Sequence, residues 1–221
     1  MGRAFVCSDI HGNYKIWTKI KNFLNADDIL YYLGDATDRG PDGWKILKEM
    51  LSHPNVIYIA GNHDIMLANR IQKPDNYHIA TIHSANGGFL TWASAEKDPE
   101  AKRVMRKLFT LPLHTTYINE FNQKIFMSHS GSTDIYDNEN LLWDREEIYK
   151  TINDTPYDII IHGHTPIPSL KKRLNDITPW DEKEVYGYNG YKIDIDCYTI
   201  KTGKTILLDL NTFDSHVFLS E

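Results

Sequence analysis

Five short segments of the chain carry residues that could hold a metal ion. Three come early and read SDIHGN (8–13), GDATDRG (34–40) and GNHD (61–64). Two come later, where His129 follows QKIFMS and His164 lies in HGHT. Carboxylates, amides and imidazoles are the ligands that proteins use for hard to borderline divalent cations. These residue types therefore predict metal-dependent chemistry.

Each segment also has an ordinary structural explanation when it is taken alone. Asp9 and His11 could cap a helix or a turn, and GNHD could form a tight turn because Gly and Asn accept left-handed backbone. His129 could be a half-buried histidine of the core. A shared site is favoured because all five segments follow a predicted strand, and the ends of parallel strands are where open α/β folds bind ligands.

In the first third of the chain, predicted strands alternate with predicted helices, and these elements must position the polar segments. Apolar runs predict strands over 3–8, 28–33 and 55–60. Apolar residues at helical spacing predict helices over 13–24, 41–51 and from about 62 to 70. Alternation of strands and helices is typical of a parallel sheet with crossover helices.

The pattern changes in the rest of the chain. Residues from about 73 to 111 look helical and less regular, with a break at GGF (87–89). The second half predicts mainly strands, over 113–119, 123–128, 158–163, 191–196 and 204–210. Since no repeat, low-complexity tract or linker divides the sequence, we expect one mixed α/β domain over residues 1–221.

Composition narrows the function classes. The chain has 221 residues, 41% hydrophobic and 24% charged, which is typical of a globular protein. Its net charge of −6 and the absence of a long basic run argue against general nucleic-acid binding. No apolar run is long enough to cross a membrane, and the start of the chain lacks a signal-peptide pattern. Two cysteines give no disulfide framework, so we expect a cytoplasmic protein.

The order and wording of the motifs resemble those of the calcineurin-like metallophosphoesterases. Within that superfamily they are most similar to compact bacterial and bacteriophage serine/threonine protein phosphatases of the phosphoprotein phosphatase branch. The matching segments are SDIHG, GDATDRG, GNHD, SHSG, LLWDRE and HGHTP, spread over residues 8–166. The resemblance implies a sandwich of two β-sheets flanked by helices, with a dinuclear metal centre at its edge. It implies two divalent cations, manganese first, with iron, zinc, nickel or cobalt as alternatives.

Carried over by position, the resemblance implies a set of metal ligands. Asp9 and His11 would hold the first cation, and Asp35 would bridge both. The second cation would be held by Asn62, His129 and His164. Two cations about 3.5–4 Å apart can activate a bridging hydroxide for in-line attack on phosphorus. No serine or cysteine nucleophile is then required.

The same resemblance implies four further roles. His63 would protonate the leaving group as the general acid, with Asp38 orienting its ring. Arg39 and Arg145 would bind phosphate oxygens, which a guanidinium can do two at a time. For Arg145 an ion pair on a helix surface is the competing interpretation.

The chain departs from the family pattern at three positions. Asp64 stands where the eukaryotic branch usually has Glu, and Asn13 where protein phosphatases tend to have Gln. Pro166 stands where many relatives place a further metal-binding His, so we expect fewer protein ligands and more water on the first cation.

Four other reactive residues are assigned no direct role. His162 is interpreted as a core residue or as support behind the ligands. His78 and His83 are interpreted as surface or packing residues, in a region that could cover the site. Cys7 is interpreted as a small core residue.

The resemblance leaves the substrate open. A serine/threonine protein phosphatase is the first prediction, and a symmetrical diadenosine tetraphosphate hydrolase or another small-nucleotide phosphodiesterase is the alternative. A nucleotide enzyme needs aromatic walls, for which the candidates are Trp92, Trp143, Tyr136 and Trp180. A non-catalytic metal-binding scaffold would be expected to lack His63 or an arginine, and both are present. The partner is thus a phosphorylated protein or a small phosphoester, and the oligomeric state is left open.

Overall fold

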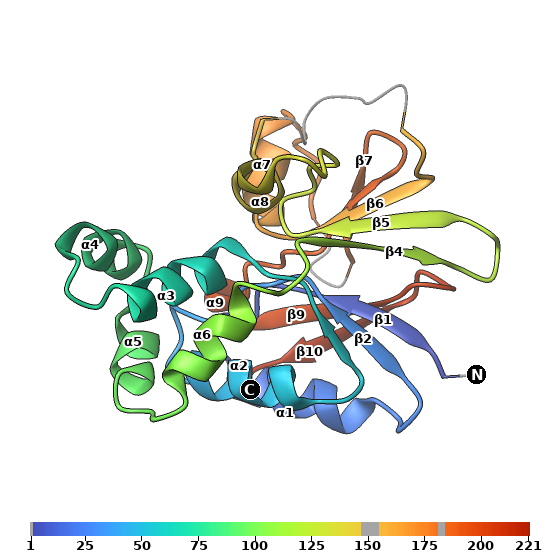
Figure 1. The fold of residues 1–221 in the computed structure, drawn as a ribbon. Helices are drawn as coiled ribbons and strands as arrows, with labels where there is room; N and C mark the ends of the chain where they lie inside the picture. The colour runs from blue at the N-terminus through green and yellow to red at the C-terminus, as the bar shows by residue number, and fades with distance from the viewer. Residues whose placement is uncertain (1, 147–154, 181–183) are drawn as a thin grey trace.

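Two five-stranded β-sheets form the centre of the molecule, with helices outside them (Figure 1). The computed structural model describes residues 2–146, 155–180 and 184–221. The sheets pack face to face, because Val6 and Leu33 of one share a buried cluster with Met127 and Ile161 of the other. This arrangement confirms the two-sheet sandwich flanked by helices.

The first sheet holds the early strands. Its order is β10 (Ser215–Leu219), β9 (Lys204–Asp209), β1 (Ala4–Cys7), β2 (Ile29–Tyr32) and β3 (Val56–Tyr58). Strands β1, β2 and β3 are parallel, with Phe5 opposite Leu30 and Leu30 opposite Val56. Strand β9 runs antiparallel to β1, and β10 antiparallel to β9. The carboxyl ends of β1, β2 and β3 therefore lie at one edge.

The second sheet holds the later strands. Its order is β4 (His114–Ile118), β5 (Lys124–Ser128), β6 (Ile159–His162), β8 (Lys192–Asp194) and β7 (Tyr186–Tyr188). Strands β5, β6 and β8 are parallel to one another, while β4 and β7 run antiparallel at the two sides. This sheet thus also has carboxyl strand ends that gather at one edge.

The helices fall into three groups (Figure 1). Helices α1 (Tyr14–Phe23) and α2 (Gly43–Ser52) cover the outer face of the first sheet. A helical region follows β3 and consists of α3 (Asn62–Gln72), α4 (Tyr77–Ala85), α5 (Phe89–Ala95) and α6 (Ala101–Leu108). Helices α7 (Asn138–Trp143) and α8 (Ile167–Arg173) lie beside the second sheet, and α9 (Thr199–Thr202) is a single turn before β9.

Side chains of a strand point alternately to its two faces, which explains how β1 contributes to two hydrophobic cores. Phe5 and Cys7 point to the helix side and pack with Trp17 of α1, while Ala4 and Val6 point to the other sheet. All four residues of β1 are buried. A strand buried on both faces reads as a continuous apolar run, which is why the sequence predicts it.

The predicted strands and helices of the first half are present within a few residues of their expected bounds. The structure adds β7, β10, α7, α8 and α9, which the sequence analysis did not predict. Strand β7 has three residues with Gly187 in the middle, and α9 is one turn long, so neither has enough residues to show a period. Part of LLWDREEIYK, from 147 on, lies outside the described residues. None of the helices in the described ranges is long and apolar enough to cross a membrane.

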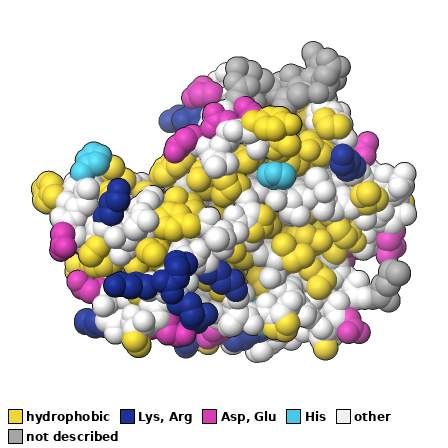
Figure 2. Space-filling view, in the orientation of Figure 1, with side chains coloured by type: hydrophobic (Ala, Val, Ile, Leu, Met, Phe, Trp, Pro, Cys, Tyr) yellow, Lys and Arg dark blue, Asp and Glu magenta, His cyan; other side chains and the backbone are white. Residues whose placement is uncertain are grey.

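One helix has a basic face, although the sequence contains no long basic run. Helix α6 exposes Lys102, Arg103, Arg106 and Lys107 on an otherwise acidic chain, and Figure 2 shows this cluster of cations on one face of the molecule. Arg103 is paired with Glu100 at 2.7 Å. Val104 and Leu108 of the same helix face the core, so the helix is amphipathic.

Candidate active site

The five polar segments meet at the edge where the two sheets come together. The loops after β1 and β2 are joined by hydrogen bonds from the amide of Asp9 to Gly34 O (3.2 Å) and from that of His11 to Asp35 O (3.1 Å). The amide of His164, in the loop after β6, donates to the Asp9 carboxylate at 3.1 Å and so joins one sheet to the other. The sequence prediction that these strand ends converge is therefore right, with three ends from one sheet and two from the other.

The backbone of these loops is unusual. Six non-glycine residues have φ between 41° and 66°, the left-handed region, and they are Asp9, His11, Asp35, Asp38, Arg39 and His164. Left-handed backbone is unfavourable for L-residues with a Cβ and persists only where the surroundings fix it.

Two groups of possible metal ligands share one carboxylate. Asp9, Asp35 and His129 offer ligand atoms within 4.8 Å of one another, and so do His11, Asp35 and His63. Asp35 belongs to both groups, which is the position expected of a bridging ligand. Asn62 Oδ1 lies 2.9 Å from His129 Nε2, and this nitrogen lies 3.5 Å from Asp35 Oδ2.

Hydrogen bonds to backbone carbonyl groups fix the orientation of two histidine rings. His11 donates its Nδ1–H to Thr37 O at 2.8 Å, and His129 donates its own to Leu33 O at 2.6 Å. Each ring therefore turns Nε2 toward the carboxylates. A backbone carbonyl behind one ring nitrogen is the usual arrangement of metal-binding histidines. The ring of His164 completes this side, with its centroid 4.9 Å from that of His129.

Burial gives these charges large effects on one another. Asp9, Asp35 and His129 are each at most 1% exposed. Burial opposes ionisation of Asp35, but His129 and His63 outweigh it and hold the pKa of Asp35 well below its usual range. Burial also opposes protonation of His129, yet Asp35 and Asp9 raise its pKa to about 10. Such a site strongly favours positive charge, and a divalent cation can supply that charge in place of the imidazole proton. The residues present therefore fit a metal.

His63 and Asp38 form a buried pair. His63 Nδ1 lies 2.8 Å from Asp38 Oδ2, and both side chains are almost fully buried. The backbone amide of His63 donates to Asp35 Oδ1 at 3.0 Å, which ties the start of α3 to the shared carboxylate. These contacts leave His63 Nε2 facing the site.

Both predicted arginines reach the site. Arg39 donates to His11 Nε2 at 2.8 Å and to His63 Nε2 at 3.0 Å. Arg145 donates from Nε to His164 Nε2 at 3.0 Å. Because α7 ends at Trp143, Arg145 lies after the helix and not on its surface, which argues against the ion-pair interpretation.

Asp64 holds the loop that carries Asp35 by hydrogen bonds. It accepts hydrogen bonds from the amides of Asp35 and Gly61, both at 3.0 Å, and from the hydroxyls of Thr37 and Tyr58. Burial and the nearby Asp35 raise the pKa of Asp64 to about 7. The shorter acid at this position thus fixes the loop that carries Asp35.

Of the two interpretations of His83, the packing one is correct and the surface one is wrong, and the structure adds a polar contact with the site. His83 on α4 is 1% exposed, and its Nε2 lies 3.1 Å from Asp38 Oδ1. Thr91 on α5 accepts a hydrogen bond from the amide of Asp38 at 2.9 Å. The sequence gives little signal for either residue, because both lie on helices far along the chain. His78, one turn earlier on α4, is exposed as expected.

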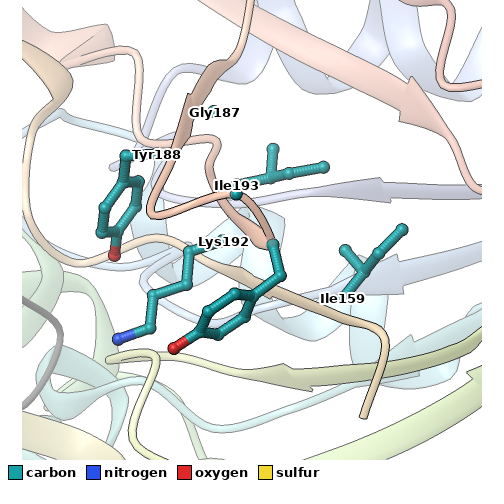
Figure 3. A pocket seen from close by; sticks show the side chains of 7 residues that line it. Ile159, Gly187, Tyr188, Lys192 and Ile193 are labelled. Atoms are coloured by element: carbon teal, nitrogen blue, oxygen red, sulfur yellow. The ribbon is translucent and has the colours of Figure 1, made fainter. Parts of the chain in front are cut away.

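The remaining histidine interpretation agrees with the structure. His162 is fully buried and its Nε2 lies 2.7 Å from the hydroxyl of Tyr188. Figure 3 shows Tyr188 and Lys192 at a small cavity of about 270 Å³ by β7 and β8. His162 therefore supports the second sheet and is not among the grouped ligands. Cys7 is buried in the core, also as expected.

Asn13 and Pro166 take structural positions. Asn13 caps α1 by accepting a hydrogen bond from the amide of Ile16 at 3.2 Å. Pro166 precedes α8 and cannot offer a ligand.

A sixth strand end, after β8, adds Asp196, which is buried and whose pKa is raised well above its usual range by burial and by Asp9.

Comparison with known proteins agrees with this geometry. The family model described as calcineurin-like phosphoesterase matches residues 2–168. Serine/threonine-protein phosphatase 2 of Escherichia coli (strain K12) is 27% identical over 190 residues, which cover 78% of this chain and 84% of that protein. The symmetrical bis(5'-nucleosyl)-tetraphosphatase of Buchnera aphidicola subsp. Schizaphis graminum is 28% identical over 168 residues, 72% of this chain and 55% of that protein. The chain thus matches about half the length of that tetraphosphatase.

Solved structures support the same fold. A metallophosphoesterase from Sphaerobacter thermophilus superimposes with a TM-score of 0.61 at 18% identity, covering 97% of this chain and 88% of the other. Fold, site and family match together define a metal-dependent phosphoesterase. The chain belongs to the calcineurin-like phosphoesterase family and is a hydrolase.

Proposed function

We propose that this protein is a metal-dependent phosphomonoesterase that removes phosphate from serine or threonine residues of proteins. A single domain over residues 1–221 would carry the activity. The observation that carries the proposal is the position of Asp35 in both ligand groups, since a shared carboxylate is what a two-metal phosphatase site needs. We further propose two divalent cations, with manganese as the first candidate.

The chain offers a complete set of ligands for such a pair. By the family pattern, Asp9 and His11 would hold one cation, Asn62, His129 and His164 the other, and Asp35 both. The distances divide the residues around Asp35 differently, with Asp9 beside His129 and His11 beside His63. The cations, when bound, supply Lewis-acid stabilisation of the phosphate and an activated water nucleophile.

His63 and the arginines supply the chemistry that belongs to the protein itself. In this proposal His63 protonates the oxygen that leaves with serine or threonine, and Asp38 holds the ring by its Nδ1–H. Arg39 and Arg145 both direct guanidinium N–H groups into the site, where they can bind phosphate oxygens and offset the charge that develops on them.

A groove beside the site supports the choice of a protein substrate. It lies between α3, α4 and α7, has a volume of about 410 Å³ and is lined by Ile65, Met66, Asn69, Ile79, Ile82, Glu139, Leu142 and Trp143. Figure 2 shows hydrophobic side chains gathered on this face between α4 and the part that carries α7. The ring of Trp143 lies 6.3 Å from that of His164, so the groove begins at the site. An apolar side chain next to a phosphorylated residue would fit it.

The same groove argues against a nucleotide as the main substrate. Among the described residues that line it, Trp143 alone is aromatic. Of the other candidates for aromatic walls, Tyr136 is 93% exposed, and Trp92 packs against the core with the Arg70 guanidinium over its ring. Trp180 is half-buried away from this groove and donates its indole N–H to Glu184 O at 2.9 Å. A base pocket with two aromatic walls is therefore not formed by these residues. The similarity to the Buchnera tetraphosphatase keeps this alternative in the test below.

A comparison of three substrates tests the proposal. With Mn²⁺ present, we expect the highest kcat/KM on a phosphoserine peptide that has an apolar residue beside the phosphate. We expect a lower value for p-nitrophenyl phosphate, which cannot use the groove, and the lowest for diadenosine tetraphosphate. A highest kcat/KM on diadenosine tetraphosphate would contradict the phosphatase proposal and support the alternative.

Removal of metal gives a second expected outcome. Dialysis against EDTA should abolish hydrolysis of every substrate, and Mn²⁺ should restore it, because the predicted mechanism uses no covalent nucleophile. The check is activity with metal content measured by atomic emission on the same samples. A phosphoenzyme intermediate that forms and persists in EDTA would contradict it.

The cytoplasmic location stays a prediction. It depends on the two cysteines, Cys7 and Cys197, which are both free and buried. The oligomeric state is left open.

A further inference from the structure

Asp38 is held by more than its contact with His63. Its carboxylate has one imidazole on each oxygen, with His63 Nδ1 at 2.8 Å from Oδ2 and His83 Nε2 at 3.1 Å from Oδ1. Asp38 is fully buried and both histidines are 1% exposed, so water does not compete for these bonds. Since an ionised carboxylate can only accept, both imidazoles donate an N–H to it.

The second imidazole comes from a helical segment that also holds the loop of Asp38 and Arg39 by its backbone and by a threonine. His83 lies on α4, and the segment from α4 to α5 makes two further hydrogen bonds to the same loop. The amide of Arg39 donates to Gly87 O at 2.9 Å, and the amide of Asp38 donates to Thr91 Oγ1 at 2.9 Å. The segment therefore holds Asp38 and Arg39 by backbone as well as by side chain.

Two glycines make this close approach possible. A Cβ on Gly88 would collide with the imidazole of His83, and a Cβ on Gly87 would come within 3.0 Å of the Arg39 side chain. Gly87 also has φ of +90°, which favours glycine. The break that the sequence shows at GGF thus leaves room for the ring of His83 against Asp38.

We propose that His83 is a positioning residue for the general acid, which fixes the Asp38 carboxylate so that the His63 ring stays aimed at the leaving group. With only one oxygen bonded, the carboxylate can rotate about its Cβ–Cγ bond and carry the His63 ring with it. With both oxygens bonded, this rotation is blocked. Small errors in the aim of a proton donor reduce its contribution strongly. The proposal rests on the acid role of His63 in the proposed function.

The test compares two variants of His83. His83→Leu removes the donor, and His83→Gln keeps an amide N–H at a similar reach. His78→Leu, which changes an exposed histidine of the same helix, is the matched control. The substrates are phenyl phosphate and p-nitrophenyl phosphate, because both are small aryl esters and differ mainly in the basicity of the leaving oxygen.

We expect His83→Leu to lower kcat on phenyl phosphate by about 10-fold, a part of the 10²–10⁴ that a general acid supplies. The loss on p-nitrophenyl phosphate should be less than about 3-fold, since that leaving group needs little protonation. KM and bound metal should not change. His83→Gln should recover most of the rate, and His78→Leu should have no effect. Equal losses on the two substrates, or a His83→Gln variant as slow as His83→Leu, would overturn the proposal.

A second variant covers the case in which His83→Leu fails to fold. Gly88→Ala leaves His83 unchanged but places a methyl group where the imidazole lies, and it should give the same selective loss on phenyl phosphate. A Gly88→Ala protein that folds, shows the displaced ring in a crystal structure and keeps its full rate on phenyl phosphate would overturn the proposal.

A measurement without substrate separates this proposal from the proposed function. Proton NMR should show two imidazole N–H signals with slow solvent exchange, one each from His63 and His83. In His83→Leu the remaining signal should exchange at least about 10-fold faster, because exchange follows the opening of the bonded pair. Unchanged exchange would overturn the role of His83 even if the enzyme proves to be a phosphatase. Faster exchange together with a preference for diadenosine tetraphosphate would overturn only the choice of substrate.

Discussion

Replacement of His63 by Asn is expected to slow hydrolysis of a phosphoserine peptide by about 10²–10⁴-fold, the usual contribution of a general acid. The serine alkoxide is strongly basic and leaves poorly unless it is protonated. The loss should shrink on p-nitrophenyl phosphate, whose leaving group departs without help. Steady-state kinetics on both substrates, with bound metal measured in parallel, check this prediction.

Two other variants show whether the effect belongs to His63 as an acid. Asp38→Asn should follow the same substrate trend more weakly, because it disturbs the orientation of the ring but leaves the ring in place. His78→Asn, at an exposed histidine, should behave as the unchanged protein. If His63→Asn kept its metals and lost equal rates on both substrates, the acid role would be refuted. Arg39 and Arg145 would then have to supply more of the catalysis.

Replacement of Asp35 by Asn should have a different signature. The change removes the charge that both ligand groups share, so it should lower the affinity for Mn²⁺ by roughly 100-fold or more. Activity on a phosphoserine peptide and on p-nitrophenyl phosphate should fall together, because both depend on the metals and not only on protonation. Calorimetric titration of Mn²⁺ into the metal-free protein gives the affinity directly.

The control for this experiment is a matched change at an exposed carboxylate. Asp75→Asn lies in the turn before α4 and should leave both affinity and rate unchanged. Normal Mn²⁺ affinity in Asp35→Asn would contradict the bridging role. A preserved rate on p-nitrophenyl phosphate with a lost rate on the peptide would also contradict it.

The sequence could predict which residues converge because their positions follow from local pattern. Asp9, Asp35 and Asn62 each come directly after a short apolar run, and the parallel pairing of β1, β2 and β3 brings the ends of such runs to one edge. His129 and His164 follow β5 and β6 in the same way. The period of strands and helices is thus enough to bring these segments to one edge, while the choice of ligands within them comes from the family resemblance.

What could not be predicted depends on contacts between distant segments. His83 lies 45 residues after Asp38 on a helix whose polar residues give no sign of which one is buried. Because α7 ends before Arg145, this side chain can point to His164. No periodicity in the sequence marks the end of that helix. The groove needs three helices to be placed against one another, which is information about packing and not about local pattern.

The left-handed backbone of the site has a consequence for the evolution and engineering of this enzyme. Six non-glycine residues in that conformation, each unfavourable by about 1 kcal/mol or more, together amount to a sum comparable with the net stability of a whole domain, about 5–15 kcal/mol. Glycine at such positions would relieve the backbone but remove a proposed metal ligand or, at Asp38 and Arg39, a proposed catalytic side chain, so selection for thermostability and selection for activity act in opposite directions here. The stabilising free energy that offsets this backbone strain must come from the two packed sheets and their helices. A much smaller scaffold could copy the side chains of this site but could not keep its loops in place.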